Sequence, residues 1–502
     1  MAHWKTSLLD AGFTGDLVIP SDPDYDTSLA RFASNAQKLA GLVAFVKSAS
    51  DVSLVIKFAT SQSPPIQFVV RGGGHSTSGA SSSDGGIVID LSRYLNTARV
   101  DVENKRCYAG GGCNWAAVDA EAIKYGLATV GGTVNHTGIG GLTLGGGYGF
   151  LTGAHGMVVD NLLGATIVTA DGSILTVNDT TNSDLFWGIR GGGCNFGCVT
   201  EFVYKLHPQR TTVYAGPLIY PAPRFGEVIE AIEGWYTGAS SDEGAMLVTA
   251  TRGRSGGPEV AVFIFYNGEE DEGKNRFKKL LDLGPVANLA TMIPYEKLNA
   301  MQNDGIPYGI NYHLNGVTRT VVPADVGLAV FNKLIETANA PSSTIATSTP
   351  SLNAAHPDSA TNDIVAPEAK LDSEPVMVLL WEYYNLNKQS SIPADATAYR
   401  MRVKRPLVTL LITWKGDSVG ASKDAKARLT AMKMFCEGAF GSVKAKVEED
   451  DTGYGNNEIG NPQSSDAAAA LYGRNYPRLQ EIKKKYDPNM VFKAWYPIRP
   501  AA

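Results

Sequence analysis

The stretch PIQFVVRGGGHSTSG, residues 65–79, decides the fold. An apolar run rich in β-branched residues, typical of a buried strand, breaks into Gly72, Gly73 and Gly74 before His75. Alone, the pattern allows two interpretations. It is either a strand that ends in an ordinary loop, or a backbone without side chains against which a large flat molecule lies, in contact with His75.

The bulk properties narrow the class of protein. A chain of 502 residues is too long for one hydrophobic core, so we expect two or three lobes. The net charge of −6 argues against a nucleic-acid partner, and no apolar run is long enough to span a bilayer. The N-terminus, MAHWKTSLLDAGF, lacks the features of a signal peptide, so we expect a cytoplasmic protein. We further expect it to be a monomer or a homodimer.

Cysteines and histidines offer no metal site. Five cysteines in so long a chain do not make a disulfide framework, and we expect free buried thiols. The seven histidines are scattered, without the spacing of zinc ligands.

A second glycine cluster lies in VGGTVNHTGIGGLTLGGGYGFLTG, residues 130–153. So many glycines cannot all lie inside helices or strands, because each loses backbone entropy there. Successive backbone amides in such a segment form a concave surface suited to the oxygens of a diphosphate. The segment is neither a Rossmann fingerprint nor a P-loop.

One rival motif indicates a hydrolase. Gly416-Asp-Ser418-Val-Gly420 matches the G-x-S-x-G nucleophile elbow, which requires a histidine further along the chain. The last histidine is His356, so we interpret the motif as a turn between a strand and a helix.

The pattern along the chain predicts an α+β lobe followed by a second lobe. Residues 39–59 read as a strand and a helix divided at Ser50-Asp51, and Asp171-Gly172 predicts a hairpin within 162–177. From about residue 210 the glycines thin out. We expect helices at 228–236 and 275–284, strands at 245–253, 259–267, 374–385 and 405–416, a surface loop or lid at 340–363, and a tail helix at 471–492 stopped by Asp487-Pro488.

Four segments, RGGGHS (71–76), GGTVNHTGIGGLTLGGGYG (131–149), DLFWGIRGGGCNFGCVTEF (184–202) and YGRNYPRLQEIKKKYDPNMVF (472–492), carry a family resemblance. The chain resembles the FAD-linked oxidases of the vanillyl-alcohol oxidase/p-cresol methylhydroxylase (PCMH) superfamily, and most closely their berberine-bridge-enzyme-like subfamily. The resemblance implies an α+β, two-lobed PCMH-type fold. Its FAD-binding domain would span 1–209, with 455–502 returning to it. A substrate domain of antiparallel sheet covered by helices would span 210–454.

The resemblance also implies a covalent flavin. His75 matches the histidine bonded to the flavin, and Val134 stands where many members carry a second, cysteine tether, so a single bond is expected. Gly132 matches a position where a small residue leaves room for oxygen, and Leu142 replaces a histidine of the namesake enzyme. The expected FAD-binding residues are Arg71, Gly72, Gly73, Gly74, His75, Ser76, Gly132, Thr133, Val134, Thr137, Gly138, Gly140, Gly141, Leu142, Gly145, Gly146, Gly147, Tyr148, Gly149, Asn161, Val199, Tyr454 and Asn457.

The activity implied is an oxidase that takes a hydride from a C–H group next to oxygen or nitrogen of a small molecule and reduces O2 to H2O2. The small molecule would be an alcohol, a sugar or a secondary metabolite, and the oxidation could include ring closure. By resemblance, Tyr454 is the first candidate for the base, and Glu382, Tyr384 and Lys388 lie on or near a strand of the pocket. Two alternatives stay open. One is a flavin dehydrogenase with an acceptor other than oxygen, and the other is a binding or storage protein that has lost catalysis.

Overall fold

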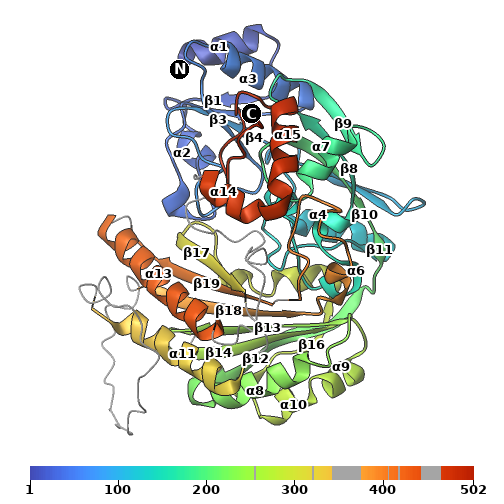
Figure 1. Ribbon diagram of the computed structural model, residues 1–502, viewed down its shortest axis with the longest axis vertical. Helices are drawn as coiled ribbons and strands as arrows, with labels where there is room; N and C mark the ends of the chain where they lie inside the picture. The colour runs from blue at the N-terminus through green and yellow to red at the C-terminus, as the bar shows by residue number, and fades with distance from the viewer. Residues whose placement is uncertain (254–255, 319–321, 342–374, 405, 417–418, 442–464) are drawn as a thin grey trace.

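A computed structural model of the protein describes residues 1–253, 256–318, 322–341, 375–404, 406–416, 419–441 and 465–502. Two lobes are stacked along the long axis (Figure 1). The upper lobe holds the first two hundred or so residues and the C-terminal segment, and the lower lobe is built on one large sheet.

A small, mostly parallel sheet begins the upper lobe. Its order is β1-β2-β4-β3, in which β2, β4 and β3 run parallel. The strands are β1 (Asp16–Val18), β2 (Leu42–Phe45), β3 (Phe68–Arg71) and β4 (Ile87–Asp90). The helix α3 (Ala49–Ser61) follows β2 and is capped by Ser48, whose hydroxyl accepts a hydrogen bond from the amide of Asp51. The predicted boundary between strand and helix, at Ser50-Asp51, therefore lies two residues too late.

A five-stranded antiparallel sheet completes the upper lobe, in the order β5-β6-β10-β8-β9. The strands are β5 (Ala98–Asp101), β6 (Arg106–Gly110), β8 (Leu162–Val168), β9 (Ile174–Asn178) and β10 (Cys198–Lys205). The predicted hairpin is confirmed: β8 and β9 pair antiparallel, and Gly172 in their turn has a φ of +78°.

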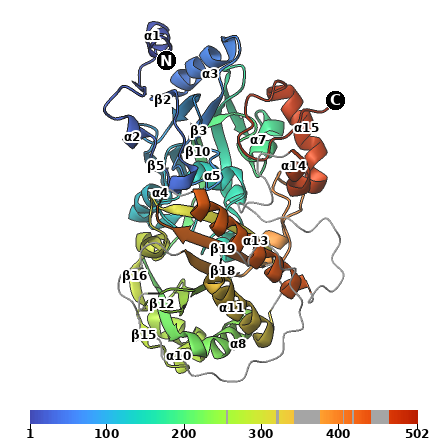
Figure 2. The ribbon, with the colours of Figure 1, turned by 90° about the vertical axis from the view of Figure 1, so that its left-hand side faces the viewer.

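The lower lobe is an antiparallel sheet covered by helices on one face, which confirms that part of the predicted fold (Figure 2). The strand order is β15-β12-β14-β13-β18-β19-β17, with β16 paired to β12. The strands are β12 (Thr212–Pro221), β13 (Glu243–Ala250), β14 (Glu259–Tyr266), β15 (Ala287–Asn288), β16 (Thr291–Pro294), β17 (Asn311–Thr318), β18 (Val376–Tyr384) and β19 (Leu407–Trp414). The helices α8 (Phe225–Tyr236), α11 (Ala324–Asn339) and α13 (Val419–Gly441) cover the outer face.

Shorter elements connect these layers. The helices are α1 (Ala2–Asp10), α2 (Tyr25–Ser28), α4 (Trp115–Ala122), α5 (Ile139–Leu144), α6 (Thr152–His155), α7 (Ser183–Ile189), α9 (Glu270–Arg276), α10 (Lys278–Asp282) and α12 (Asn387–Ser390). The two-residue strands β7 (Leu127–Ala128) and β11 (His207–Pro208) pair with each other.

The remaining expectations concern the cysteines, membrane spans, metal sites, the G-x-S-x-G motif and the surface loop or lid. The five cysteines are all free. In the described ranges no helix could cross a membrane, and no group of side chains could hold a metal ion. In the G-x-S-x-G segment, Gly416 follows β19 and Val419 and Gly420 belong to α13. Ser418 lies outside the described residues, as does most of the expected lid.

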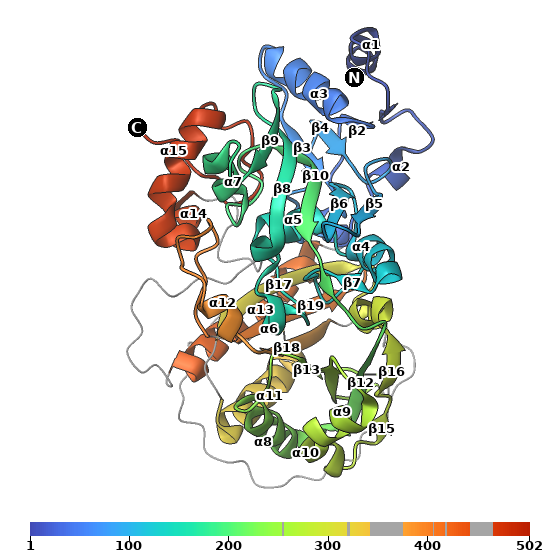
Figure 3. The same ribbon diagram turned by 90° about the vertical axis from the view of Figure 1, so that its right-hand side faces the viewer.

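The C-terminal segment returns to the upper lobe. Helices α14 (Ser465–Tyr472) and α15 (Tyr476–Tyr486) lie beside α7, and α15 ends just before Asp487-Pro488, as predicted (Figure 3). The ammonium of Lys483 is fully buried. It donates to Asp487 and to the carbonyls of Asn195 and Phe492, each at 2.6 Å, and so fastens α15 to the glycine-rich segment that contains Asn195.

This buried ion pair predicts a stability effect. We expect Lys483→Ala to lower the free energy of unfolding by about 3–5 kcal/mol, because it leaves the Asp487 carboxylate buried without its partner charge. The exposed neighbour Lys484, substituted in the same way, should change it by less than about 0.5 kcal/mol. Denaturant unfolding of both variants measures the difference, and equal losses would contradict the role assigned to Lys483.

Candidate cofactor and substrate site

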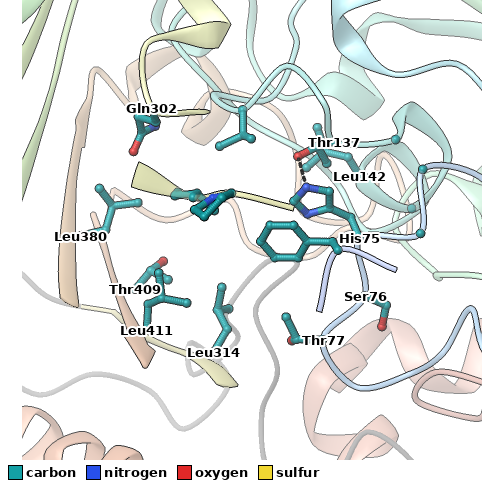
Figure 4. Close-up of a pocket in the computed structure, with 18 of the residues that line it drawn as sticks. His75, Ser76, Thr77, Thr137, Leu142, Gln302, Leu314, Leu380, Thr409 and Leu411 are labelled. Carbon is teal, nitrogen blue, oxygen red and sulfur yellow. Dashed lines mark hydrogen bonds between the residues drawn. The ribbon is translucent and has the colours of Figure 1, made fainter. Parts of the chain in front are cut away.

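A cavity of about 770 Å³ lies between the lobes. The upper lobe contributes the glycine loops and His75, and the lower sheet contributes the face that its helices leave uncovered. Figure 4 shows His75, Thr137 and Leu142 on one side and Leu380 and Leu411 on the other. The cavity therefore contacts both the glycine motifs and the predicted substrate sheet.

Two glycine loops touch each other at the wall of this cavity. A Cβ atom added to Gly73 would lie 2.5 Å from the amide nitrogen of Gly138, and one added to Gly138 would lie 2.4 Å from that of Gly73. Real Cβ atoms do not approach backbone so closely, so both positions require glycine. These two glycines therefore bring the loops together, and the missing side chains do not face the cavity as clearance for a ring.

The backbone amides of the loop at 73–76 donate no hydrogen bond to the described part of the protein. The carbonyls of Gly73 and Gly74 accept hydrogen bonds from the Tyr308 hydroxyl and the Phe32 amide. Within the described residues, the amides of residues 73–76 donate to no protein acceptor, although all four residues line the cavity. Gly74 is buried and the other three residues are half-buried, so a run of amides without protein acceptors in this wall suits the oxygens of a phosphate.

Gly141 is open to the cavity. A Cβ atom added there would meet no atom within 4 Å, and the residue is exposed although it lines a cavity wall. A side chain at this position would occupy cavity space and would not clash with protein. The volume beside Gly141 is therefore available to a ligand.

The other glycines of the second cluster pack against protein. A Cβ atom on Gly146 would enter the ring of Tyr399, and one on Gly149 would overlap the carbonyl of Gly131. These residues do not line the cavity, nor do Gly145, Gly147, Gly132 or Thr133. Of the predicted cofactor residues, the cavity wall holds Gly72, Gly73, Gly74, His75, Ser76, Val134, Thr137, Gly138, Gly140, Gly141, Leu142, Tyr148 and Val199.

Two other predicted residues support the wall from behind. Arg71 forms a 2.6 Å ion pair with buried Asp90 across β3 and β4. The buried amide of Asn161 donates to the carbonyls of His155 and Met157 and contacts His207. Tyr454 and Asn457 lie outside the described residues.

His75 is held in a well-defined environment. Its ring stacks on Phe32 with centroids 3.8 Å apart, and its Nε2 lies 2.8 Å from Nδ1 of His136 and 3.4 Å from the hydroxyl of Thr137. Burial, and next the neighbouring His136, lower the pKa of His75 to about 3. The imidazole is thus neutral at physiological pH and keeps a nitrogen lone pair.

The positions and pKa values of the cysteine thiols bear on whether a second covalent bond to a cofactor could form. Val134 lines the cavity, whereas Cys113 is buried in the core away from it. Cys194 and Cys198 do line it, a feature the sequence analysis missed. Burial raises the pKa of both thiols, to about 12 for Cys198, so they stay protonated and are poor nucleophiles.

Across the cavity the sheet presents an apolar surface. Every second residue of β18 faces inward, namely Val376, Val378, Leu380 and Glu382. The neighbouring strands add Ile219, Val248, Ala250, Ala261, Phe263, Leu314 and Leu411. The polar or charged side chains on this side are Arg252, Glu259, Gln302, Asp304, Thr409 and Thr413.

Glu382 is the buried acid of this surface. The hydroxyl of Tyr148, from the upper lobe, donates to its carboxylate at 2.6 Å. Burial raises the pKa of Glu382 to about 8, and the Tyr148 bond opposes that shift. A carboxyl poised near neutral pH in a cavity is suited to proton transfer.

The other two strand-associated candidates do not reach the cavity. Tyr384 is buried two residues beyond Glu382 along β18, and it packs against Tyr148 and Phe150. Lys388 is exposed on α12, because β18 ends at Tyr384 and the chain turns outward. Neither is placed to contact a ligand in the cavity.

Sequence reasoning missed Phe32 and His136. No local pattern marks Phe32, which comes from a loop far from the glycine motifs. His136 stands inside the motif GGTVNHTG, where the spacing of metal ligands gives no signal. The available signal is its place in the second glycine cluster, directly before the expected FAD-binding residue Thr137.

Comparisons with known proteins identify the family of the chain. Residues 40–178 match the family model described as an FAD binding domain, and residues 452–499 match the one described as berberine and berberine like. The FAD-linked oxidoreductase pgmH of Aspergillus terreus is 31% identical over 506 residues, which cover 96% of this chain and 92% of that protein.

Two solved structures share the fold. One is 6-hydroxy-D-nicotine oxidase from Arthrobacter nicotinovorans, with a TM-score of 0.78 and 24% identity over 98% of this chain and 99% of that one. The other is the glucooligosaccharide oxidase of Acremonium strictum, which carries a 6-S-cysteinyl, 8α-N1-histidyl FAD, with a TM-score of 0.78 and 21% identity over 99% of both chains. At these identities the likeness is one of fold.

FAD fits the residues present. The unpartnered amides at 73–76 suit its diphosphate, and the open space beside Gly141 can take a bulky group.

We expect Gly141→Leu to weaken FAD binding about tenfold or more, since the new side chain occupies that space. Gly226→Leu on α8, where an added Cβ also meets nothing within 4 Å, is the control. Flavin fluorescence titration of both variants in a His75→Ala background, in which no bond to His75 can form, measures the two affinities, and equal affinities would contradict this placement.

Proposed function

Because the chain belongs to the family of FAD-linked oxidoreductases, we propose that it is an oxidase of small molecules. It removes a hydride from a carbon bonded to oxygen or nitrogen and passes the electrons to dioxygen, which becomes hydrogen peroxide. One observation carries this proposal: a single cavity is bordered by His75 on one side and by the ionisable Glu382 on the other. When bound, FAD supplies the hydride acceptor.

In this proposal FAD is attached covalently through His75 alone. The buried, neutral imidazole of His75 supports the role, because a lone pair on nitrogen is what a nucleophile needs. The thiols support the single attachment. Cys113 lies away from the cavity, and burial keeps Cys194 and Cys198 protonated. Gly132 lies behind the side chain of Leu142 and does not line the cavity, so its role in admitting oxygen stays a prediction.

Glu382 is the base of the proposed reaction. It accepts the proton of the substrate hydroxyl or amine while the hydride leaves the neighbouring carbon. Its pKa of about 8 leaves roughly one carboxyl in ten ionised at pH 7, and the Tyr148 hydroxyl stabilises that ionised form. Burial makes this carboxylate a stronger base than an exposed one.

The substrate class follows from the cavity wall. Leu314, Leu380, Leu411 and Phe263 present hydrocarbon to the substrate, and apolar side chains outnumber polar ones on this side of the cavity. An oligosaccharide carries hydroxyls around every ring, and each would lose its water without a replacement partner. We propose that the substrate is a largely apolar alcohol or amine with one polar group near Glu382.

The base can be tested through pH dependence. The rate of flavin bleaching by substrate, measured without oxygen by stopped flow, should rise about tenfold per pH unit and level off above pH 8, because only ionised Glu382 accepts the proton. Glu382→Gln should remove this dependence and slow bleaching by about 10²–10⁴-fold. Tyr148→Phe should move the rise to higher pH, since it removes the bond that lowers the pKa. A Glu382→Gln profile identical to wild type would exclude this base.

The oxidase assignment and the substrate class are tested together. Peroxide formation should be at least about tenfold faster with benzylic alcohols or cyclic amines than with cellobiose. Flavin that is bleached by these compounds but not reoxidised by oxygen would favour the dehydrogenase alternative. Faster turnover of cellobiose would contradict the apolar substrate class.

A further inference from the structure

Two histidines from different glycine loops form a hydrogen-bonded pair. Nε2 of His75 lies 2.8 Å from Nδ1 of His136, and the ring centroids are 4.9 Å apart. The pair exists because Gly73 and Gly138, each two residues from one of the histidines, let the loops meet. His136 itself does not line the cavity.

The tautomers of the pair are fixed by a backbone carbonyl. Nε2 of His136 lies 3.2 Å from the carbonyl oxygen of Ile306, in the lower lobe. A carbonyl only accepts, so this nitrogen carries the hydrogen. In a neutral ring, Nδ1 of His136 is then an acceptor. Burial lowers the pKa of both rings, which keeps them neutral.

It follows that His75 donates its Nε2 hydrogen to His136. The lone pair of His75 is left on Nδ1, which makes no hydrogen bond to any described residue. Phe32 stacks on the ring at 3.8 Å and an interplanar angle of 11°, which limits rotation. The nucleophilic nitrogen and its direction are therefore both set before any ligand arrives.

From this arrangement we propose that His136 is a positioning residue for the attachment of FAD, fixing the reactive tautomer of His75 and taking up its Nε2 proton. The inference rests on the proposed covalent bond through His75. A bond forms between His75 Nδ1 and the methyl carbon on the flavin ring. One hydrogen leaves that carbon and one leaves Nε2. Dioxygen takes up the corresponding two electrons and two protons and becomes hydrogen peroxide.

Attachment can be followed without measuring turnover. Purified full-length protein is incubated with excess FAD in air, and the flavin that stays with the acid-precipitated chain is measured over time. We expect His136→Ala to bind FAD but to attach it about 10²-fold more slowly than wild type. His136→Gln should lie between the two, because its amide accepts the Nε2 hydrogen but takes up no proton.

Controls separate the possible outcomes. His155 is also part-buried beside a second histidine, with ring centroids 3.7 Å apart, but it does not line the cavity, and His155→Ala should attach FAD at the wild-type rate. Wild-type attachment rates in His136→Ala or in His136→Gln would overturn the role of His136. If wild type itself retains no flavin after precipitation, the tether through His75 fails as well, and the two failures are thereby told apart.

Discussion

The contact between the backbones of Gly73 and Gly138 is the constraint on which the rest of the site depends. Any side chain at either residue would have to pass through the other loop. The contact places His75 against His136 and turns a run of unpartnered amides toward the cavity. The same glycines therefore shape the amide-lined wall of the cavity and position His75, the residue proposed to carry FAD.

The lower lobe completes the site chemically as well as covering it. Its strand β18 supplies Glu382, whose carboxylate accepts a hydrogen bond from the hydroxyl of Tyr148 in the upper lobe. Its segment at Ile306 supplies the carbonyl that orients His136. The proposed cofactor attachment and the proposed proton removal would thus both use groups from each lobe. Packing between the lobes is expected to affect both steps, because a small shift there changes hydrogen bonds on both sides.

The fold was predictable because its signals are local. Strand runs, the Asp171-Gly172 hairpin and the order of four motifs identified both lobes, and the family resemblance placed Glu382 and Tyr384 on or near a strand of the pocket. The sequence could not reveal that the cavity ends between those two residues, because that boundary depends on where Tyr148 packs. It likewise could not show that Phe32 stacks on His75, a contact between segments 43 residues apart that no spacing rule encodes.

The central claim is that this cavity holds one FAD bonded to His75. Proteolysis of denatured wild-type protein followed by mass spectrometry of the yellow peptides tests it most directly. The account predicts one flavin per chain, carried on the peptide that contains His75. Flavin on a peptide that contains Cys194 or Cys198, or no flavin-bearing peptide at all, would contradict it.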